Sequence, residues 1–269
     1  MPIKRKIGLI AGNGRLPQVL AKGIRASGHP VIAIGHNSET RKDLKNYVDC
    51  LKWVHVGELG KIISLLVEEG AKSAILIGGV SKRHFFSRAR PDGRALKVLS
   101  RLRDKKDDAI LRAIAEEIES EGIQVESPVR FLKESMAPGG CWTERKPTER
   151  EKKDLTFGWK IAKRVGNLDV GQSVVVKDQI ILAVEAIEGT DETIRRGGLL
   201  GRGDVVVVKV CKPKQDPRLD LPVIGPGTIR TLKEAGASVL AVEAGKTIVV
   251  DKKKVIREAN RDQICLIGM

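Results

Sequence analysis

Glycine-rich turns after apolar runs are the first features of this sequence that could do chemistry. Gly12-Asn13-Gly14 follows the apolar run Ile7–Ala11 and precedes a helical pattern. Such glycines let the backbone approach a phosphate, and the following helix offers free N–H groups and a positive dipole end. Pro17 breaks a strict Gly-x-Gly-x-x-Gly motif, and no Gly-Lys-Ser/Thr of a P-loop follows. A tight strand-to-helix turn alone would also require these glycines.

Two further segments combine polar groups near the ends of apolar runs. Gly78-Gly79 is followed by Val80, Ser81 and two cations, which suits an anionic ligand beside the first turn or an ordinary turn with a basic tail. Asp107 and its neighbour Asp108 precede a helical pattern, where they could bind Mg²⁺ or a substrate hydroxyl. Spacing alone favours the simpler role of an N-cap for them.

The second half of the chain offers carboxylates and cations in two turns. Glu185–Asp191 gathers carboxylates, a glycine and the Thr190 hydroxyl, which suits Mg²⁺ or simple capping by Thr190 or Asp191. The proline-stiffened stretch from Lys212 to Thr228 carries both charge signs, including Asp220. Asp220 could cap a helix expected from Pro222, or it could serve as an acid beside phosphate charge. Together these segments predict a phosphate-bearing ligand bound between two α/β units.

The elements that must position these residues alternate between strands and helices. In the first half, apolar strands are predicted at 7–11, 30–34 and 74–78, with helices at 18–27, 61–69, 96–103 and 109–121. This alternation predicts a parallel sheet covered by helices. In the second half, a helix is predicted at 154–165, a hairpin at 173–177 and 180–186, strands at 204–210, 238–242, 247–250 and 264–267, and helices from 190, at 222–235 and at 252–260.

The segment 128–150 changes character, with prolines, glycines and mixed charges that indicate a loop and linker. We therefore expect two α/β domains: a Rossmann-like, nucleotide-binding parallel-sheet domain over 1–133 and a mixed-sheet catalytic domain over 134–269.

Composition limits the class of protein. The 269 residues include 49 Lys+Arg and 34 Asp+Glu, a net charge of +15, which favours anionic partners such as phosphorylated substrates, nucleic acid or an anionic membrane surface. Aromatic residues make up only 3%, which disfavours base-stacking nucleic-acid modules. The four cysteines and four histidines form no closely spaced ligand pairs, so a zinc site has no support. We expect a cytoplasmic protein, since neither a signal peptide nor a long apolar span is evident.

These motifs in this order resemble the LpxI family of UDP-2,3-diacylglucosamine hydrolases, which act in lipid A biosynthesis. The resemblance covers essentially the whole chain. The segments that carry it are 8–17, 57–61, 79–81, 96–99, 107–111, 169–172, 182–186, 188–191 and 220–225.

The resemblance implies a two-domain homodimer with its site between the domains. It implies Mg²⁺-dependent cleavage of the substrate's pyrophosphate, giving UMP and 2,3-diacylglucosamine 1-phosphate, on the cytoplasmic face of the inner membrane. It places the essential aspartate, also the expected metal ligand, at Asp220, with Asp191 and Lys212 as further catalytic candidates. The implied substrate-binding positions are Gly12, Asn13, Val80, Ser81, Asp107, Gln172 and Thr190. A family member has Gly-Asn-Val-Ser where this chain has Gly78–Ser81, so an asparagine contact is missing at Gly79.

Two other functions remain open on the residues alone. A nicotinamide-dependent oxidoreductase would need an acidic residue about 20 residues beyond the glycine turn, where the chain offers only Glu39. A basic nucleic-acid-binding protein is disfavoured by scattered cations and by the absence of a helix-turn-helix signature. We therefore expect no nucleic-acid partner.

Overall fold

The computed structural model describes residues 5–80, 89–102, 107–213 and 215–269. The chain divides into two compact units, each with its own sheet. The first unit contains Met1–Lys133 together with Asp216–Asp220, and the second contains Glu134–Gln215 and Leu221–Met269. The sequence had placed every residue after 133 in the second domain. The short segment Asp216–Asp220 departs from that expectation because it packs on the first unit.

The first unit is built on a parallel five-stranded sheet, as expected. The strands run in the order β3-β2-β1-β4-β5, and each adjacent pair is parallel. They are β1 (Ile7–Ala11), β2 (Val31–His36), β3 (Cys50–Val54), β4 (Ser73–Ile77) and β5 (Gln124–Val125). The strand order reverses direction between β1 and β4. In open parallel sheets, ligands bind beyond the carboxyl ends of the strands at such a point.

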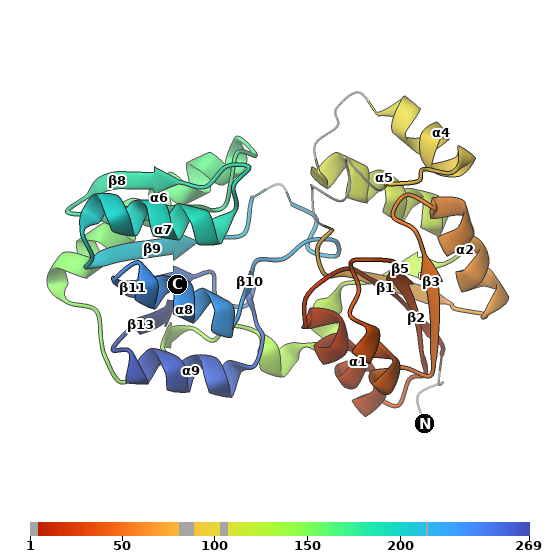
Figure 1. Cartoon of the computed structure of the whole chain (residues 1–269), viewed down its shortest axis with the longest axis horizontal. Coiled ribbons are helices and arrows are strands. Elements are labelled where there is room, and N and C mark those ends of the chain that lie inside the picture. The colour runs from red at the N-terminus through yellow and green to blue at the C-terminus, as the bar shows by residue number, and fades with distance from the viewer. Residues whose placement is uncertain (1–4, 81–88, 103–106, 214) are drawn as a thin grey trace. The chain divides into compact units, whose positions relative to one another are not determined.

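Helices cover both faces of this sheet, with α1 on one side and α2 on the other (Figure 1). This follows from right-handed crossovers that lead outward in opposite directions from the centre of the sheet. The helical segments are α1 (Leu16–Ala26), η1 (Lys42–Tyr47), α2 (Leu59–Glu68), α4 (Gly93–Arg101), α5 (Asp107–Glu119) and η2 (Pro128–Phe131). Ile10, Leu66, Ala115 and Ile118 share one buried core with Leu219 of the segment Asp216–Asp220.

The second unit contains a mixed six-stranded sheet in the order β6-β13-β11-β9-β7-β8. The β7–β8 hairpin is antiparallel, as predicted, and β7 also pairs antiparallel with β9. The strands are β6 (Gly140–Cys141), β7 (Ser173–Lys177), β8 (Ile180–Val184), β9 (Val205–Lys209), β11 (Ala237–Val242) and β13 (Cys265–Gly268). A separate parallel pair joins β10 (Val223–Ile224) to β12 (Ile248–Val249).

The valine-rich strands of the second unit are buried on both faces. Val205 and Val207 of β9 belong to one core cluster, whereas Val206 and Val208 belong to another. This alternation follows from the two-residue period of a strand. The helices of the unit are α6 (Glu149–Asn167), α7 (Thr190–Gly201), α8 (Pro226–Glu234) and α9 (Lys252–Arg261), and the short η3 (Lys133–Ser135) begins at the last residue of the first unit's main segment.

Two predicted helices begin at other residues than expected, and some strands, β3 among them, were not predicted. Helix α6 begins at Glu149 rather than at 154, because Thr148 and Glu151 form a capping box. Helix α8 begins at Pro226 rather than at Pro222, because residues 223–224 pair with β12 instead. In the part of the chain that the structure describes, no helix is both long enough and apolar enough to cross a bilayer.

Candidate active site

The two glycine turns of the first unit lie against each other at the point where the strand order reverses. Gly12 N–H donates to the carbonyl oxygen of Ile77 (2.8 Å), and Asn13 N–H donates to that of Gly79 (2.7 Å). A Cβ atom on Gly12 would lie only 2.3 Å from the Gly79 oxygen. Glycine is therefore required here by close backbone approach, and the two predicted turns are in direct backbone contact.

Asn13 also contacts a carboxylate that the sequence had given little weight. Its Nδ2 donates to Oε2 of Glu39 over 3.1 Å, and Glu39 is buried just beyond β2. A carboxylate in this position can accept hydrogen bonds from the sugar of a nucleotide. Burial lowers the pKa of the nearby His36, although the charge of Glu39 opposes this effect. His36 is therefore neutral at neutral pH and adds no cation to the turn.

Three predicted positions of the first unit are only partly described. Val80 is exposed directly after the second glycine turn. Ser81 lies outside the described residues. Asp107 is the first residue of α5, but its side chain is outside the described part.

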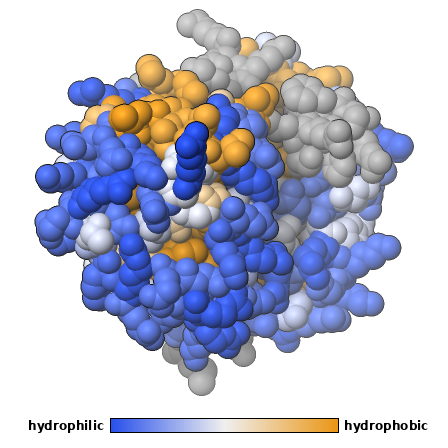
Figure 2. Space-filling view, turned by 60° about the vertical axis from the view of Figure 1, so that its left-hand side comes forward, coloured by the Kyte–Doolittle hydropathy of each residue, from blue (hydrophilic) through white to orange (hydrophobic). Residues whose placement is uncertain are grey.

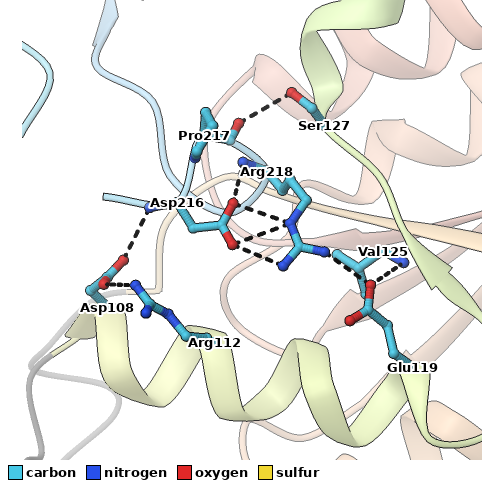
Figure 3. A network of polar contacts seen from close by, with 8 residues as sticks. All are labelled: Asp108, Arg112, Glu119, Val125, Ser127, Asp216, Pro217 and Arg218. Carbon is cyan, nitrogen blue, oxygen red and sulfur yellow. Dashed lines mark hydrogen bonds and ion pairs between the residues drawn. The ribbon is translucent and has the colours of Figure 1, made fainter. Parts of the chain in front are cut away.

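Asp220 is an exposed residue between two buried leucines, Leu219 and Leu221. The suggestion that it caps a helix starting at Pro222 is wrong, because the N-cap of α8 is Gly225. The preceding residues are held by a polar network on α5, shown in Figure 3. In this network the Arg218 guanidinium holds the pKa of the Asp216 carboxyl below its usual value, mainly through hydrogen bonds. The sequence places Arg218 in the stretch expected to hold phosphate charge, whereas in the structure its guanidinium pairs with Asp216 and Glu119; Asp216 was not predicted as part of the site.

A second group of site residues surrounds the buried side chain of Lys209 in the second unit. Lys209 Nζ donates to Thr190 Oγ1 (3.1 Å) and to the carbonyl oxygen of Val223 (3.1 Å). The Thr190 hydroxyl donates to Oε1 of the buried Glu185 over 2.9 Å. Gln172 lies alongside, since its N–H donates to the other oxygen of Glu185 (3.4 Å). The structure therefore brings together the predicted residues Gln172 and Thr190 with Glu185 of the predicted turn, and adds Lys209.

The buried Oε1 atom of Gln172 has no hydrogen-bond partner in the structure. A buried amide oxygen without a partner is costly, so a ligand donor beside it would be stabilised. The capping roles suggested for Thr190 and Asp191 are not observed, because Gly189 is the N-cap of α7 and no side chain caps the helix. Asp191 is exposed in the first turn of α7, where its negative charge favours the helix dipole.

Lys212 forms an ion pair that the sequence had not predicted. Its Nζ lies 2.7 Å from Oδ1 of Asp169, and both side chains are about one quarter exposed. Asp169 belongs to the same 169–172 motif as Gln172. The pair fixes the position of the ammonium group, which stays accessible to an anionic ligand.

The donors that the structure provides limit the kind of metal site that the protein can form. Over 5–80, 89–102, 107–213 and 215–269, no three His, Cys, Asp or Glu side chains gather to hold a metal ion. Mg²⁺, however, usually keeps several waters and takes only one or two protein carboxylates with substrate phosphates. An exposed carboxylate such as that of Asp220 fits this donor set, whereas a metal held by protein ligands alone does not.

Comparison with known proteins decides the family. An LpxI N-terminal domain model matches residues 6–135, and an LpxI C-terminal domain model matches residues 138–267. A Caulobacter vibrioides protein named UDP-2,3-diacylglucosamine pyrophosphatase LpxI is 37% identical over 276 residues, 98% of each chain. The chain belongs to the LpxI family. The resemblance based on its motifs is thereby confirmed.

Solved structures resemble this LpxI chain only weakly. The biotin carboxylase domain of a thermophilic 2-oxoglutarate carboxylase is 15% identical, with a TM-score of 0.29, over 64% of this chain and 35% of that one. The glycinamide-RNase-transformylase T of Mycobacterium tuberculosis is 11% identical, with the same score, over 68% and 44%. This LpxI chain thus spans less than half of either protein, and no function follows from these similarities.

Proposed function

We propose that this LpxI protein hydrolyses the pyrophosphate bond of UDP-2,3-diacylglucosamine, giving UMP and 2,3-diacylglucosamine 1-phosphate for lipid A biosynthesis. The observation that carries the proposal is the 37% identity across 98% of both chains to the Caulobacter protein of that name. The two glycine turns and the Lys209 group add sites suited to a nucleotide-sugar ligand.

The chemistry of a pyrophosphate explains why such residues are needed. Its negative charges repel an incoming water, so cations must neutralise them and a carboxylate must orient the water or hold a metal ion. In this proposal Asp220 supplies the carboxylate and Lys212 screens phosphate charge. Asp191 is a further catalytic residue. Substrate contacts come from Gly12, Asn13, Val80, Ser81, Asp107, Gln172 and Thr190.

Mg²⁺ is part of this proposal as the cofactor. When bound, it would neutralise pyrophosphate oxygens and lower the pKa of a bound water. Asp220 is the residue that would hold it, with the remaining ligands from water and substrate. The residues of the chain then orient the substrate through the glycine turns and fix its charge through Lys212.

The substrate carries acyl chains, so we propose that the protein docks on the cytoplasmic face of the inner membrane. The net charge of +15 favours anionic lipid. Each well-placed Lys or Arg contributes about 1 kcal/mol to such binding. Sedimentation with liposomes tests this, and binding that ignores both lipid charge and salt would contradict it.

Homodimer formation is proposed at the open edge of the second sheet. Strand β8 pairs only with β7 among the described strands. Exposed apolar residues lie on β8 and on the adjacent α7: Ile180 (63% exposed), Leu199 (80%) and Leu200 (60%). Figure 2, which brings the side of the second unit forward, shows hydrophobic residues gathered in one area of a largely hydrophilic face. An open strand edge can pair with its own copy about a twofold axis. Sedimentation of Leu199→Glu should then show a monomer where wild type shows a dimer.

The proposed activity is tested by incubating the purified protein with UDP-2,3-diacylglucosamine, with and without Mg²⁺. UMP should be released only with the metal. Running the reaction in ¹⁸O-labelled water shows which product takes up the oxygen. No UMP release under any condition, together with binding of a nicotinamide nucleotide, would instead favour an oxidoreductase that uses Glu39.

A further inference from the structure

The five-residue segment Asp216–Asp220 is anchored to the first unit, although the residues on both sides of it belong to the second. We propose that Arg218 is a positioning residue, which acts by holding this segment on α5 so that the Asp220 carboxylate has a fixed place. The inference rests on the proposed function, since it assigns a role to Asp220 in that reaction. It concerns contacts within the first unit only.

Arg218 joins the segment to itself and to α5. Its Nε lies 3.2 and 3.1 Å from the two oxygens of Asp216, and its Nη2 lies 2.9 Å from Oδ2. Its Nη1 donates to Oε1 of Glu119, at the end of α5, over 2.9 Å. One planar guanidinium thus bridges two carboxylates, which the single ammonium of lysine cannot reproduce.

The backbone of the segment is held as well. Ser127 Oγ donates to the carbonyl oxygen of Pro217 (3.1 Å), and Asp216 N–H donates to Oδ1 of Asp108 (3.4 Å). Leu219 N–H and Asp220 N–H both donate back to the carbonyl oxygen of Asp216 (3.0 and 3.3 Å), which closes a turn. Figure 3 shows the side chains of Asp108, Glu119, Asp216 and Arg218 converging along one side of α5.

Apolar packing fixes the residue next to Asp220. The Leu219 side chain is buried in the core that contains Ala115 and Ile118 of α5. Asp220 itself is exposed. The segment therefore holds the exposed residue Asp220 on a backbone that is tied by hydrogen bonds, ion pairs and a buried leucine within four residues.

Loss of Arg218 would leave the carboxylates of Asp216 and Glu119 without their shared cation. Their repulsion would loosen the turn that carries Asp220, while the glycine turns and the Lys209 group keep their own contacts. A displacement of about 1 Å in a reacting group can cost on the order of 100-fold in rate. Turnover should therefore suffer more than substrate affinity.

The test compares Arg218→Lys and Glu119→Gln in two backgrounds, wild type and Asp220→Asn, with UMP release as the assay. In the wild-type background we expect kcat to fall roughly 10- to 100-fold, with KM changed by less than about threefold. In the Asp220→Asn background the same substitutions should cost less than about twofold, because a residue that acts through Asp220 has nothing left to position. Arg130→Gln is the control, since Arg130 is an arginine of the same unit that pairs with Glu126, 3.4 Å away.

The outcomes separate the inference from the proposed function. Equal losses in both backgrounds, or wild-type kcat in both single variants, would overturn the positioning role. If Arg218→Lys does not fold, Glu119→Gln keeps the test decisive, because a glutamine still accepts the Val125 N–H that Glu119 accepts now (3.2 Å). Absence of UMP release by the wild-type protein would overturn the proposed function, and the inference with it.

Discussion

Asn13 donates its backbone N–H to the carbonyl oxygen of Gly79 over 2.7 Å, so the turns after β1 and β4 are joined at their backbones. The two residues are 66 positions apart in sequence (79 − 13). The contact leaves no room for a side chain on the preceding residue, Gly12. This steric requirement and the proposed ligand contact fall on the same residue.

Gly12→Ala should destabilise the protein by about 1–3 kcal/mol, because the new methyl group would press on the Gly79 backbone and force the two turns apart. UMP release should fall together with the free energy of unfolding in urea. Gly93→Ala is the matched control, since a Cβ there meets nothing within 4 Å. If Gly12→Ala had the same free energy of unfolding as wild type, the two turns would be able to move apart without loss of stability, and the steric requirement would be contradicted.

Thr190→Val removes the hydroxyl that links Glu185 and Lys209 while keeping the shape of the side chain. We expect a loss of about 1–3 kcal/mol in the free energy of unfolding, because two buried charged groups each lose a hydrogen-bond partner. Thr156→Val on the surface of α6 should change it by less than about 0.5 kcal/mol. Equal effects of the two substitutions in urea unfolding would argue against an energetic role for the Lys209 group.

The sequence predicts best those elements that are determined by residues close together in the chain, such as tight turns and helix caps. The β7–β8 hairpin followed from two β-branched runs around a short polar turn, and the structure gives Asp178 and Gln179 the positive φ values of that turn. The start of α6 also has a local signal, because Thr148-x-x-Glu151 is the pattern of a capping box. Pro222 and Pro226 are both suitable first residues for α8. The helix begins at Pro226 because residues 223–224 form β10, which pairs with β12.

Site residues held by tertiary contacts were harder to predict. The place of Arg218 depends on Glu119, 99 residues away in sequence. Leu219 packs in the core of the first unit, although the chain on both sides of Asp216–Asp220 belongs to the second unit. No local sequence pattern predicts this packing. Lys209 did carry a signal, since it is a lysine directly after four valines of a buried strand. A charged residue that is buried needs partners, and this reasoning would have pointed to Thr190.

Asp262 should contribute stability only above acidic pH. Hydrogen bonds from Arg261 and Lys233 lower its pKa to about 2 from the usual 3.8. Because the folded-state pKa is depressed, the contribution is complete above the unfolded value and disappears as pH falls through the folded one. In urea unfolding, wild type should therefore exceed Asp262→Asn in stability at neutral pH, and the gap should close between about pH 4 and pH 2. A gap that stays constant over this range would contradict the pKa shift.

Removing divalent cations should abolish activity without weakening the fold. The described residues contain no group of three His, Cys, Asp or Glu that could hold a metal ion. In the proposal the metal binds together with substrate, so it adds nothing to the free energy of unfolding of the substrate-free protein. With EDTA we expect UMP release to stop and to recover on addition of Mg²⁺, while the midpoint of thermal unfolding without substrate stays unchanged. A clear drop in that midpoint with EDTA would indicate a resident metal site instead.

Asp220→Asn tests the residue on which the proposed reaction depends most. The amide keeps the size of the side chain but can neither accept a proton nor attract a cation, so kcat should fall by at least about 100-fold. The fold should be retained, because the Asp220 side chain is exposed and its neighbours Leu219 and Leu221 keep their buried positions. Asp178→Asn, at the exposed turn of the β7–β8 hairpin, serves as the control and should keep wild-type turnover. Calorimetry with the intact substrate completes the test, since the Asp220→Asn protein should still bind it, and loss of binding would assign Asp220 to recognition rather than to catalysis.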